Sequence, residues 1–306
     1  MNILNKDRFS IKGGRTGDDP PLLFILASPR TGSTFLYQLL INTYDFIYIN
    51  NLINDRFSKS IASGIYISKL AGGFNKKISY NSSYGKTKRW YEPSEGSMVF
   101  GNWYGGSHPS EIYSANPKNA KSMSRDIMRA YKVSRVPIIF KNAWNCFRIK
   151  DLSHRYPNAF FIWLRRDIVK SASSDLESRN NQGSPYIWNS ATTRNYKDLF
   201  DLEPYKQSVE QQFYFNKSIE KNLNKYSEGR FCELWYEDLC SNIYDEVGRI
   251  EQLIAYAWNK KIVKNKKIDI DCISKNKSLK LNKDILNYVY SQRDRFVGLT
   301  KDDYFR

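Results

Sequence analysis

The chain has 306 residues, 41% of them hydrophobic, and a formal net charge of +17 at pH 7. That composition is typical of a globular protein with a sizeable core, and no apolar run reaches the ~18 residues of a membrane-spanning helix. The cationic excess indicates anionic partners, a description that fits nucleotides, acidic polysaccharides, lipid headgroups and nucleic acids alike.

Short apolar runs bounded by polar or turn residues recur along the chain, and they predict strands buried on both faces of a parallel sheet. These runs are Leu22–Ala27, Pro137–Phe140, Ala159–Leu164 and Phe231–Trp235. Helical patterns follow or separate them at Ser33–Thr43, Cys146–Tyr156, Ile168–Arg179 and Ser241–Ala257. Strands that alternate with helices predict an α/β fold, a parallel sheet flanked by helices.

The remaining segments suggest one domain over residues 21–306, preceded by a loosely held polar arm over 1–20. Residues 60–125 are rich in Gly, Ser, Asn, Tyr and Trp with weak periodicity. We expect them to form a loop-rich, substrate-facing insertion with a short helical part, outside the core. The Lys-rich segment 259–283 is expected to be solvated surface. Because the N-terminus has no apolar signal-peptide region, a cytoplasmic location is expected.

The cysteines do not indicate a metal site or a disulfide framework. Cys146, Cys232, Cys240 and Cys272 lack C-x-x-C spacing, and the chain has only two histidines. Buried free thiols and no bound metal are therefore expected.

The first motif follows the first strand, in "LLFILASPRTGSTFLYQLL". A strand, a tight turn and a helix N-terminus make an anion site, because backbone N–H groups and the helix dipole favour negative charge. Ala27, Gly32 and Thr34 keep the frame of the Walker pattern G-x-x-x-x-G-K-[ST], but Ser33 replaces its lysine. The loop therefore suits a phosphate that needs no magnesium. A simple junction in which Ser33 caps the helix is the alternative.

The second motif is "FFIWLRRDIVKSASSDLESR". Arg166 ends a strand and Ser174 lies two helical turns further on, so both can reach one anion. The alternative is that Asp167 caps the helix and the arginines are surface charges.

In this order the two motifs resemble the PAPS-dependent sulfotransferases (PAPS is 3′-phosphoadenosine 5′-phosphosulfate). In that family P-[KR]-[ST]-G-[ST]-[ST] holds the 5′-phosphosulfate, and it is read here as Pro29-Arg30-Thr31-Gly32-Ser33-Thr34. The pattern R-[DN]-P with a later serine holds the 3′-phosphate, and it is read here as Arg166-Asp167-Ile168 with Ser174, Ile168 replacing the proline.

Two further segments extend the resemblance over roughly residues 20–255. "VPIIFKNAWNCFRIKDLSHRYPNAFFIWLRRD" is similar to the bacterial and Golgi carbohydrate-type branch, and "FCELWYEDL" matches a late strand end that includes Tyr236, a further donor-site residue. The resemblance implies a P-loop-like sulfotransferase fold with PAPS as co-substrate and no metal. The R-K-G-x-x-G motif of the cytosolic branch is missing, so part of the 3′-phosphate site is unassigned.

The resemblance also implies a chemistry. Arg30 and Lys141 would stabilise charge on the leaving phosphate during in-line sulfuryl transfer, and a general base must take the proton of the acceptor hydroxyl. Ala143 stands where the cytosolic branch has a histidine base. Glu95, in Pro93-Ser94-Glu95, is slightly favoured, with Glu92 and His108 as competitors.

A saccharide is the preferred acceptor, because the resemblance is to the carbohydrate-type branch. Aromatic rings with nearby polar groups suit sugars or other flat-ring acceptors, and the alternative is that most of these rings are core or loop anchors. The candidate rings are Trp90, Tyr91, Trp103, Tyr104 and Trp188.

Three alternatives remain open at this stage. A P-loop kinase or nucleotide hydrolase would require magnesium and a Walker lysine. A non-catalytic basic protein would bind nucleic acid in a salt-dependent way, although no specific nucleic-acid motif is present. A family member without catalytic activity would bind the nucleotide alone.

Overall fold

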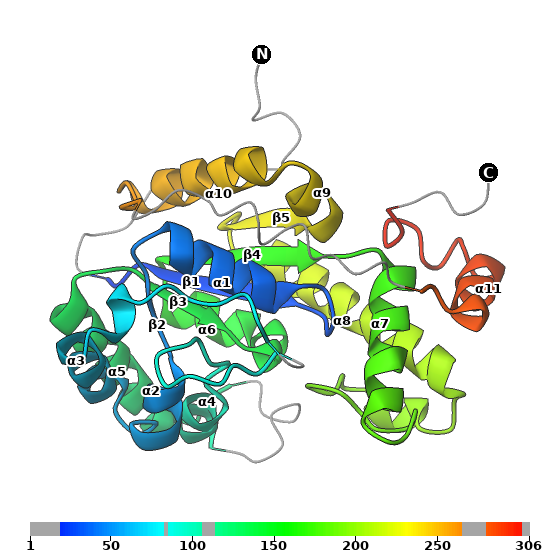
Figure 1. Cartoon of the computed structure of the whole chain (residues 1–306), viewed down its shortest axis with the longest axis horizontal. Coiled ribbons are helices and arrows are strands. Elements are labelled where there is room, and N and C mark those ends of the chain that lie inside the picture. The colour runs from blue at the N-terminus through cyan, green and yellow to red at the C-terminus, as the bar shows by residue number, and fades with distance from the viewer. Residues whose placement is uncertain (1–18, 83–84, 106–113, 265–279, 302–306) are drawn as a thin grey trace.

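The computed structural model describes residues 19–82, 85–105, 114–264 and 280–301. Its centre is a five-stranded parallel sheet in the order β2-β3-β1-β4-β5 (Figure 1). The strands are β1 (Leu22–Ala27), β2 (Ile47–Tyr48), β3 (Ile138–Lys141), β4 (Ala159–Arg165) and β5 (Phe231–Trp235). The predicted α/β fold is confirmed. Since β1 lies between β3 and β4, the carboxyl ends of these three strands meet at one edge.

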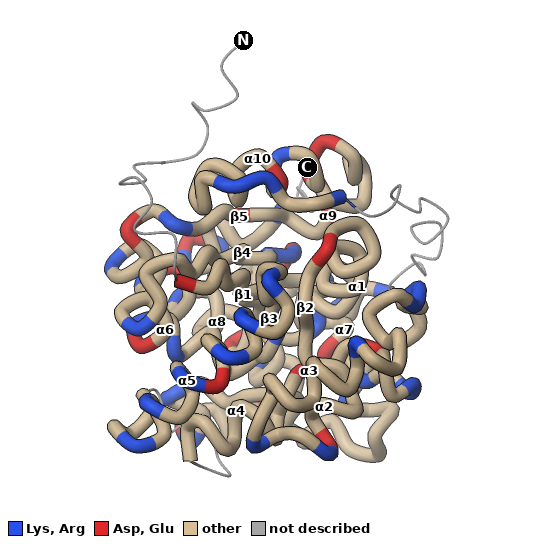
Figure 2. The backbone as a smooth tube through the Cα atoms, turned by 90° about the vertical axis from the view of Figure 1, so that its left-hand side faces the viewer, with Lys and Arg blue, Asp and Glu red and all other residues tan. Residues whose placement is uncertain are grey.

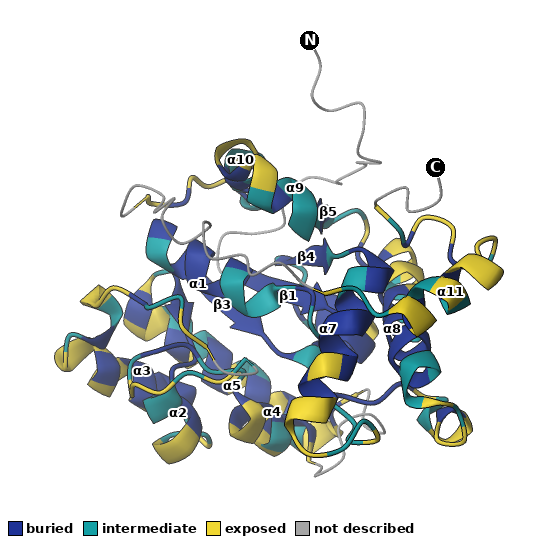
Figure 3. Ribbon diagram, turned by 45° about the vertical axis from the view of Figure 1, so that its right-hand side comes forward, coloured by how far each residue is buried: buried dark blue, intermediate teal, exposed yellow. Residues whose placement is uncertain are grey.

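Helices cover both faces of the sheet. Successive strand residues point to opposite faces, and in β1 the residues on both faces are apolar and buried. Leu23 and Ile25 of β1 pack against α1 (Ser33–Thr43), α9 (Tyr236–Ser241) and α10 (Ile243–Trp258). Leu22 and Phe24 face the other side. That side is covered by α2 (Asn51–Arg56), α3 (Ile61–Leu70), α4 (Ser97–Tyr104), α5 (Pro117–Ser134), α6 (Ile149–Arg155) and α8 (Pro204–Tyr226). Figure 3 shows the central strands as buried.

Among the described residues, three short 3-10 helices and two further α-helices complete the fold. The 3-10 helices are η2 (Gly73–Asn75), η4 (Ala143–Phe147) and η5 (Tyr196–Leu199). Helix α7 (Ile168–Asn181) packs against α8 and α11 (Lys283–Ser291) around a separate apolar cluster that includes Val169, Val209 and Phe296. The chain after α11 braces the start of α7, because Lys301 N donates to Asp167 Oδ2 at 2.7 Å.

The insertion differs from its prediction. It contains α3, η2, α4 and the start of α5, and Ile65, Phe100 and Met123 lie in the main core. The expectation that residues 60–125 lie outside the core is therefore wrong. Small polar residues between the apolar positions lowered the average hydrophobicity and concealed the helical spacing.

Other boundaries also differ. The predicted helix Cys146–Tyr156 is split into η4 and α6, and the predicted helix Ser241–Ala257 is preceded by the separate α9. Helix α8, with 23 residues, was not predicted, although its buried Val209, Phe215, Ile219 and Leu223 have helical spacing. Strand β2 has two residues, too few for a pattern.

Several expectations concern residues outside the described part of the chain: His108, Cys272, and most of the arm and of segment 259–283. Within that part, Cys146 and Cys232 are buried free thiols as predicted, whereas Cys240 is partly exposed. None of the helices among the described residues is both long and apolar enough to cross a membrane.

Candidate active site

The loop between β1 and α1 has the backbone of an anion cradle. Gly32 precedes α1 with φ 87° and has no side chain to cap the helix, so the first N–H groups of α1 remain available to an anion. Ser33 is the first residue of the helix, not its cap. Arg30 also has a positive φ, 64°, which is uncommon for a residue with a side chain. The turn therefore leaves the N-terminus of α1 accessible to an anion.

The carbonyl groups of residues 27–30 are each held by a side chain. In chain order their donors are the Cys146 thiol at 3.4 Å, the Thr31 hydroxyl at 2.6 Å, the Gln212 amide at 3.0 Å and the Arg166 guanidinium at 2.9 Å. In a trans peptide the C=O and the next N–H point in opposite directions. Fixing these four carbonyls therefore fixes the peptide planes of the loop, and with them the N–H groups of Ser28, Arg30 and Thr31. The Thr31 hydroxyl is used within the loop.

The second motif meets the first at this loop. Arg166 Nη1 donates to Arg30 O at 2.9 Å, and Arg30 Nε donates to Ser174 Oγ at 3.3 Å. Asp167 does cap α7, accepting from the N–H groups of Val169 and Lys170 at 2.9 and 3.1 Å. Arg166 is nevertheless no surface charge, because its Nε is buried without a hydrogen-bond partner among the described residues. A buried cationic donor of this kind suits an anion.

The two arginines of the motif have different surroundings. Arg165 pairs with Glu233, donates to Gly298 O, and lies between the rings of Trp163 and Trp235. These contacts make Arg165 a link between β4, β5 and the C-terminal segment. Arg166 faces the loop instead.

Tyr236 closes the cradle from the side of β5. A Cβ at Gly32 would overlap Tyr236 Cε2, so only glycine allows this approach. The Arg166 guanidinium lies 4.9 Å from the centre of the tyrosine ring. Burial, with a smaller effect of Cys240, raises the pKa of Tyr236, so the phenol is neutral near pH 7.

Lys141 joins the loop to the favoured base. Its ammonium donates to Thr34 Oγ1 at 3.3 Å and forms an ion pair with Glu95 Oε1. The lysine side chain is 9% exposed and the glutamate side chain 34%, so the carboxylate is open to solvent. Gly85 lies over this group, since a Cβ there would stand 3.1 Å from Glu95 Oε1.

Glu95 is also held through its backbone. Asn142, the residue after Lys141, donates from Nδ2 to Glu95 O at 2.9 Å and caps η4 through Trp144 N at 3.0 Å. Ser94 N donates to Ile49 O at 2.8 Å, which ties the segment to the end of β2. Asn142 was not predicted from the sequence. Its only sequence signal is its position as a polar residue directly after a strand lysine.

Glu92 has a different environment. Its carboxylate accepts from Ser79 Oγ at 2.6 Å and from Lys88 N and Arg89 N at 3.0 Å each. Burial opposes ionisation, but the Arg89 and Lys88 N–H groups and the Ser79 hydroxyl outweigh it and lower the pKa of Glu92. The group is thus a poor proton acceptor.

Two of the candidate sugar-binding rings are in the core. Trp103 and Tyr104 are 4% and 2% exposed, and Tyr104 donates to Asp151 Oδ2 at 3.1 Å. Trp90, by contrast, is 37% exposed. Of the predicted rings, Trp90, Tyr91 and Trp188 retain access to solvent.

Among the described residues, no group of three His, Cys, Asp or Glu side chains is placed to hold a metal ion. The residues present instead fit a polyanionic nucleotide: a glycine-built cradle, an open helix N-terminus, and the cations Arg30, Lys141 and Arg166.

Residues 21–260, more than three quarters of the chain, match the model of the Sulfotransferase family. The chain belongs to the sulfotransferase family. It is therefore an enzyme of the sulfotransferase type that moves a sulfuryl group, and the family implies PAPS as co-substrate. This membership decides against the kinase and nucleic-acid-binding alternatives.

Solved sulfotransferases share the fold. Sulfotransferase STF1 from Mycobacterium tuberculosis H37Rv is 14% identical with a TM-score of 0.51, over 92% of this chain and 77% of its own. Sulfotransferase STF9 from Mycobacterium avium is 13% identical with a TM-score of 0.50, over 90% of this chain and 69% of its own. A search of curated proteins with the sequence of this chain found no match.

Proposed function

We propose that this sulfotransferase transfers the sulfuryl group of PAPS to a carbohydrate hydroxyl, with Glu95 as general base. The observation that carries the proposal is the contact of Lys141 with both Glu95 and Thr34, which joins a carboxylate, an ammonium and the open end of α1. When bound, PAPS supplies the sulfuryl group and leaves as adenosine 3′,5′-bisphosphate. The acceptor oxygen forms the new S–O bond as the old one breaks.

The roles of the side chains follow from their positions. Glu95 takes the hydroxyl proton, while Lys141, Arg30 and the N–H groups of α1 stabilise charge on the leaving phosphate. Arg166 and Ser174 would hold the 3′-phosphate, with Tyr236 beside them. Support for a carbohydrate comes from the resemblance to the carbohydrate-type branch. Glu92 is not proposed as the base.

The test is calorimetric titration with adenosine 3′,5′-bisphosphate in EDTA, with ATP and magnesium as comparison. We expect metal-independent binding that prefers the bisphosphate. Arg166→Ala should weaken it about tenfold or more, because a charged hydrogen-bond donor to a phosphate is lost. Lys225→Ala, an exposed lysine on α8, is the matched control and should bind like the wild type.

Transfer is then measured with labelled PAPS and a panel of saccharides. Arg30→Ala and Lys141→Ala should lose turnover. A preference for ATP with magnesium, or normal turnover in both variants, would overturn the proposal. Transfer only to non-carbohydrate hydroxyls would retain the sulfotransferase mechanism and reject the acceptor.

A further inference from the structure

Helix α3 is apolar on both its inner and its outer side. Ile61 and Ile65 are buried in the core, and Asp126 of α5 accepts from Ile61 N at 2.9 Å. On the outer side Tyr66, Ile67 and Leu70 are 54%, 40% and 69% exposed. A helix that is apolar all round normally has a partner on each side. In the part of the chain that the structure describes, the outer side is open to solvent.

The segment around α3 is strongly basic. From residue 56 to residue 91 the sequence contains eight Lys or Arg residues and no Asp or Glu. All eight are exposed: Arg56, Lys59, Lys69, Lys76, Lys77, Lys86, Lys88 and Arg89. Figure 2, which looks at this side of the molecule, shows α2, α3, α4 and α5 together in its lower half.

One more exposed ring extends the apolar part. A Cβ at Gly73 would lie 2.8 Å from Trp90 Cζ3, so the indole packs against η2, three residues after Leu70. Lys76, on the other side of η2, lies 5.5 Å from the centre of the Tyr91 ring. We call the exposed side chains Tyr66, Ile67, Leu70 and Trp90, together with the eight cations, the α3 surface.

We propose that the α3 surface docks on an anionic lipid bilayer. Aliphatic and aromatic side chains rimmed by lysines are the pattern that binds at the membrane interface, where the rings and aliphatic groups enter the headgroup layer and the cations meet lipid phosphates. Nucleic acids and acidic polysaccharides would account for the cations. They leave Ile67 and Leu70 without an apolar partner, so the observations favour the bilayer.

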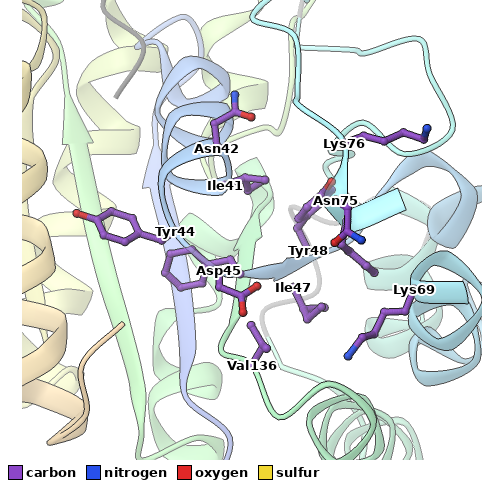
Figure 4. Close-up of a pocket in the computed structure, with 12 residues that line it drawn as sticks. Ile41, Asn42, Tyr44, Asp45, Ile47, Tyr48, Lys69, Asn75, Lys76 and Val136 are labelled. Carbon is purple, nitrogen blue, oxygen red and sulfur yellow. The ribbon is translucent and has the colours of Figure 1, made fainter. Parts of the chain in front are cut away.

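The α3 surface adjoins a cavity, and its basic segment reaches the candidate active site. A cavity of about 420 Å³ lies between the α3 surface and strand β2. It is lined by Lys69 and Lys76 together with Asn42, Asp45 and Tyr48 (Figure 4). This cavity is at the carboxyl end of α1, roughly 16 Å along the helix from the anion cradle. Gly85, in the same basic segment, lies beside the Glu95 and Lys141 pair, since a Cβ there would stand 3.1 Å from Glu95 Oε1 and 3.8 Å from Lys141 Nζ. If the proposed function holds, the bound enzyme would face acceptors carried by lipids.

The experiment is co-sedimentation of the full chain with vesicles of phosphatidylcholine alone or with 30% phosphatidylglycerol. We expect binding to the anionic vesicles that falls as salt increases. Leu70→Glu should lower the partition coefficient about tenfold or more, through lost apolar burial and added charge. Lys69→Glu with Lys76→Glu should lower it about fivefold or more per site on anionic vesicles.

Matched controls test whether the effect belongs to this surface. Val297→Glu changes an apolar residue that is 72% exposed elsewhere, and Lys221→Glu with Lys225→Glu reverses two exposed charges on α8. Both control proteins should bind vesicles like the wild type. Bisphosphate binding should be unchanged in Leu70→Glu, which separates docking from the donor site.

Three results would overturn the proposal. One is failure of the wild type to sediment with anionic vesicles. Another is an equal loss of binding in Leu70→Glu and Val297→Glu. The third is a dimer in light scattering that Leu70→Glu converts to monomers, since a second copy would then cover the surface.

Discussion

At the scale of single residues, Glu92 and Glu95 show how surroundings decide the use of a carboxylate. The two lie three positions apart in the same loop. Glu92 accepts three hydrogen bonds from residues 79–89, and so has little capacity to take a further proton. Glu95 has one cationic partner, Lys141, and remains partly exposed. Of the two glutamates, only Glu95 combines contact with Lys141 and access for an acceptor.

Glu95→Gln tests this assignment directly. The amide keeps the size of the side chain but cannot take the acceptor proton, so we expect kcat to fall about 100-fold or more. Bisphosphate binding should change by less than about threefold, because Glu95 is not part of the proposed donor site. Single-turnover transfer and calorimetry measure the two quantities. Unchanged kcat would move the role of base to another residue.

At the scale of elements, α8 contributes to the candidate site although it lies far from the anion-binding loop in the sequence. Gln212 lies near the middle of the helix, and its Nε2 reaches Pro29 O across 183 positions of sequence. Asn216, one turn later, accepts from Trp163 Nε1 at 3.3 Å, which fixes α8 against β4. A core helix thereby helps to set the backbone of the anion cradle.

Gln212→Leu should loosen that backbone. A buried carbonyl without its donor costs about 1–3 kcal/mol, and the freed Pro29 peptide can rotate. We expect bisphosphate binding to weaken about fivefold to tenfold while the helical circular dichroism stays unchanged. Asn224→Leu, an exposed site on the same helix, is the control. Wild-type affinity in Gln212→Leu would show that the other three carbonyl contacts suffice.

At the scale of the whole molecule, ionisation of buried carboxylates links stability to pH. The folded protein lowers the pKa of Glu92 below its usual value of 4.5. A lowered folded-state pKa stabilises the folded protein above the unfolded-state pKa, and this contribution is lost as pH falls through the folded-state pKa.

Glu92→Gln should therefore destabilise the protein in a pH-dependent way. At pH 7 we expect a loss of about 2 kcal/mol, because charged hydrogen bonds to the Lys88 and Arg89 N–H groups are weakened. The difference from the wild type should shrink below about pH 4.5. Urea unfolding at several pH values measures it, and kcat at pH 7 should be unchanged. A difference that is constant with pH would reject the electrostatic explanation.

Sequence alone determined those parts of the protein that depend on neighbours in the chain. β1, the glycine turn and α1 have the predicted boundaries, because an apolar run, Gly32 and a helical pattern act over a few residues. The ordered motifs also led to the family. Hydrophobicity averaged over short segments did not reveal α8. It also placed Phe100 and Met123 outside the core, because small polar residues surround them.

Tertiary structure decided the assembly of the candidate site. The pairing of Lys141 with Glu95, the bond from Arg30 to Ser174, and the hold of Gln212 on Pro29 span 46, 144 and 183 positions. Such contacts arise only when the strand order β3-β1-β4 brings three carboxyl ends to one edge. Sequence periodicity reports which face of an element is buried, but not which other element covers it, because burial of apolar surface is non-directional.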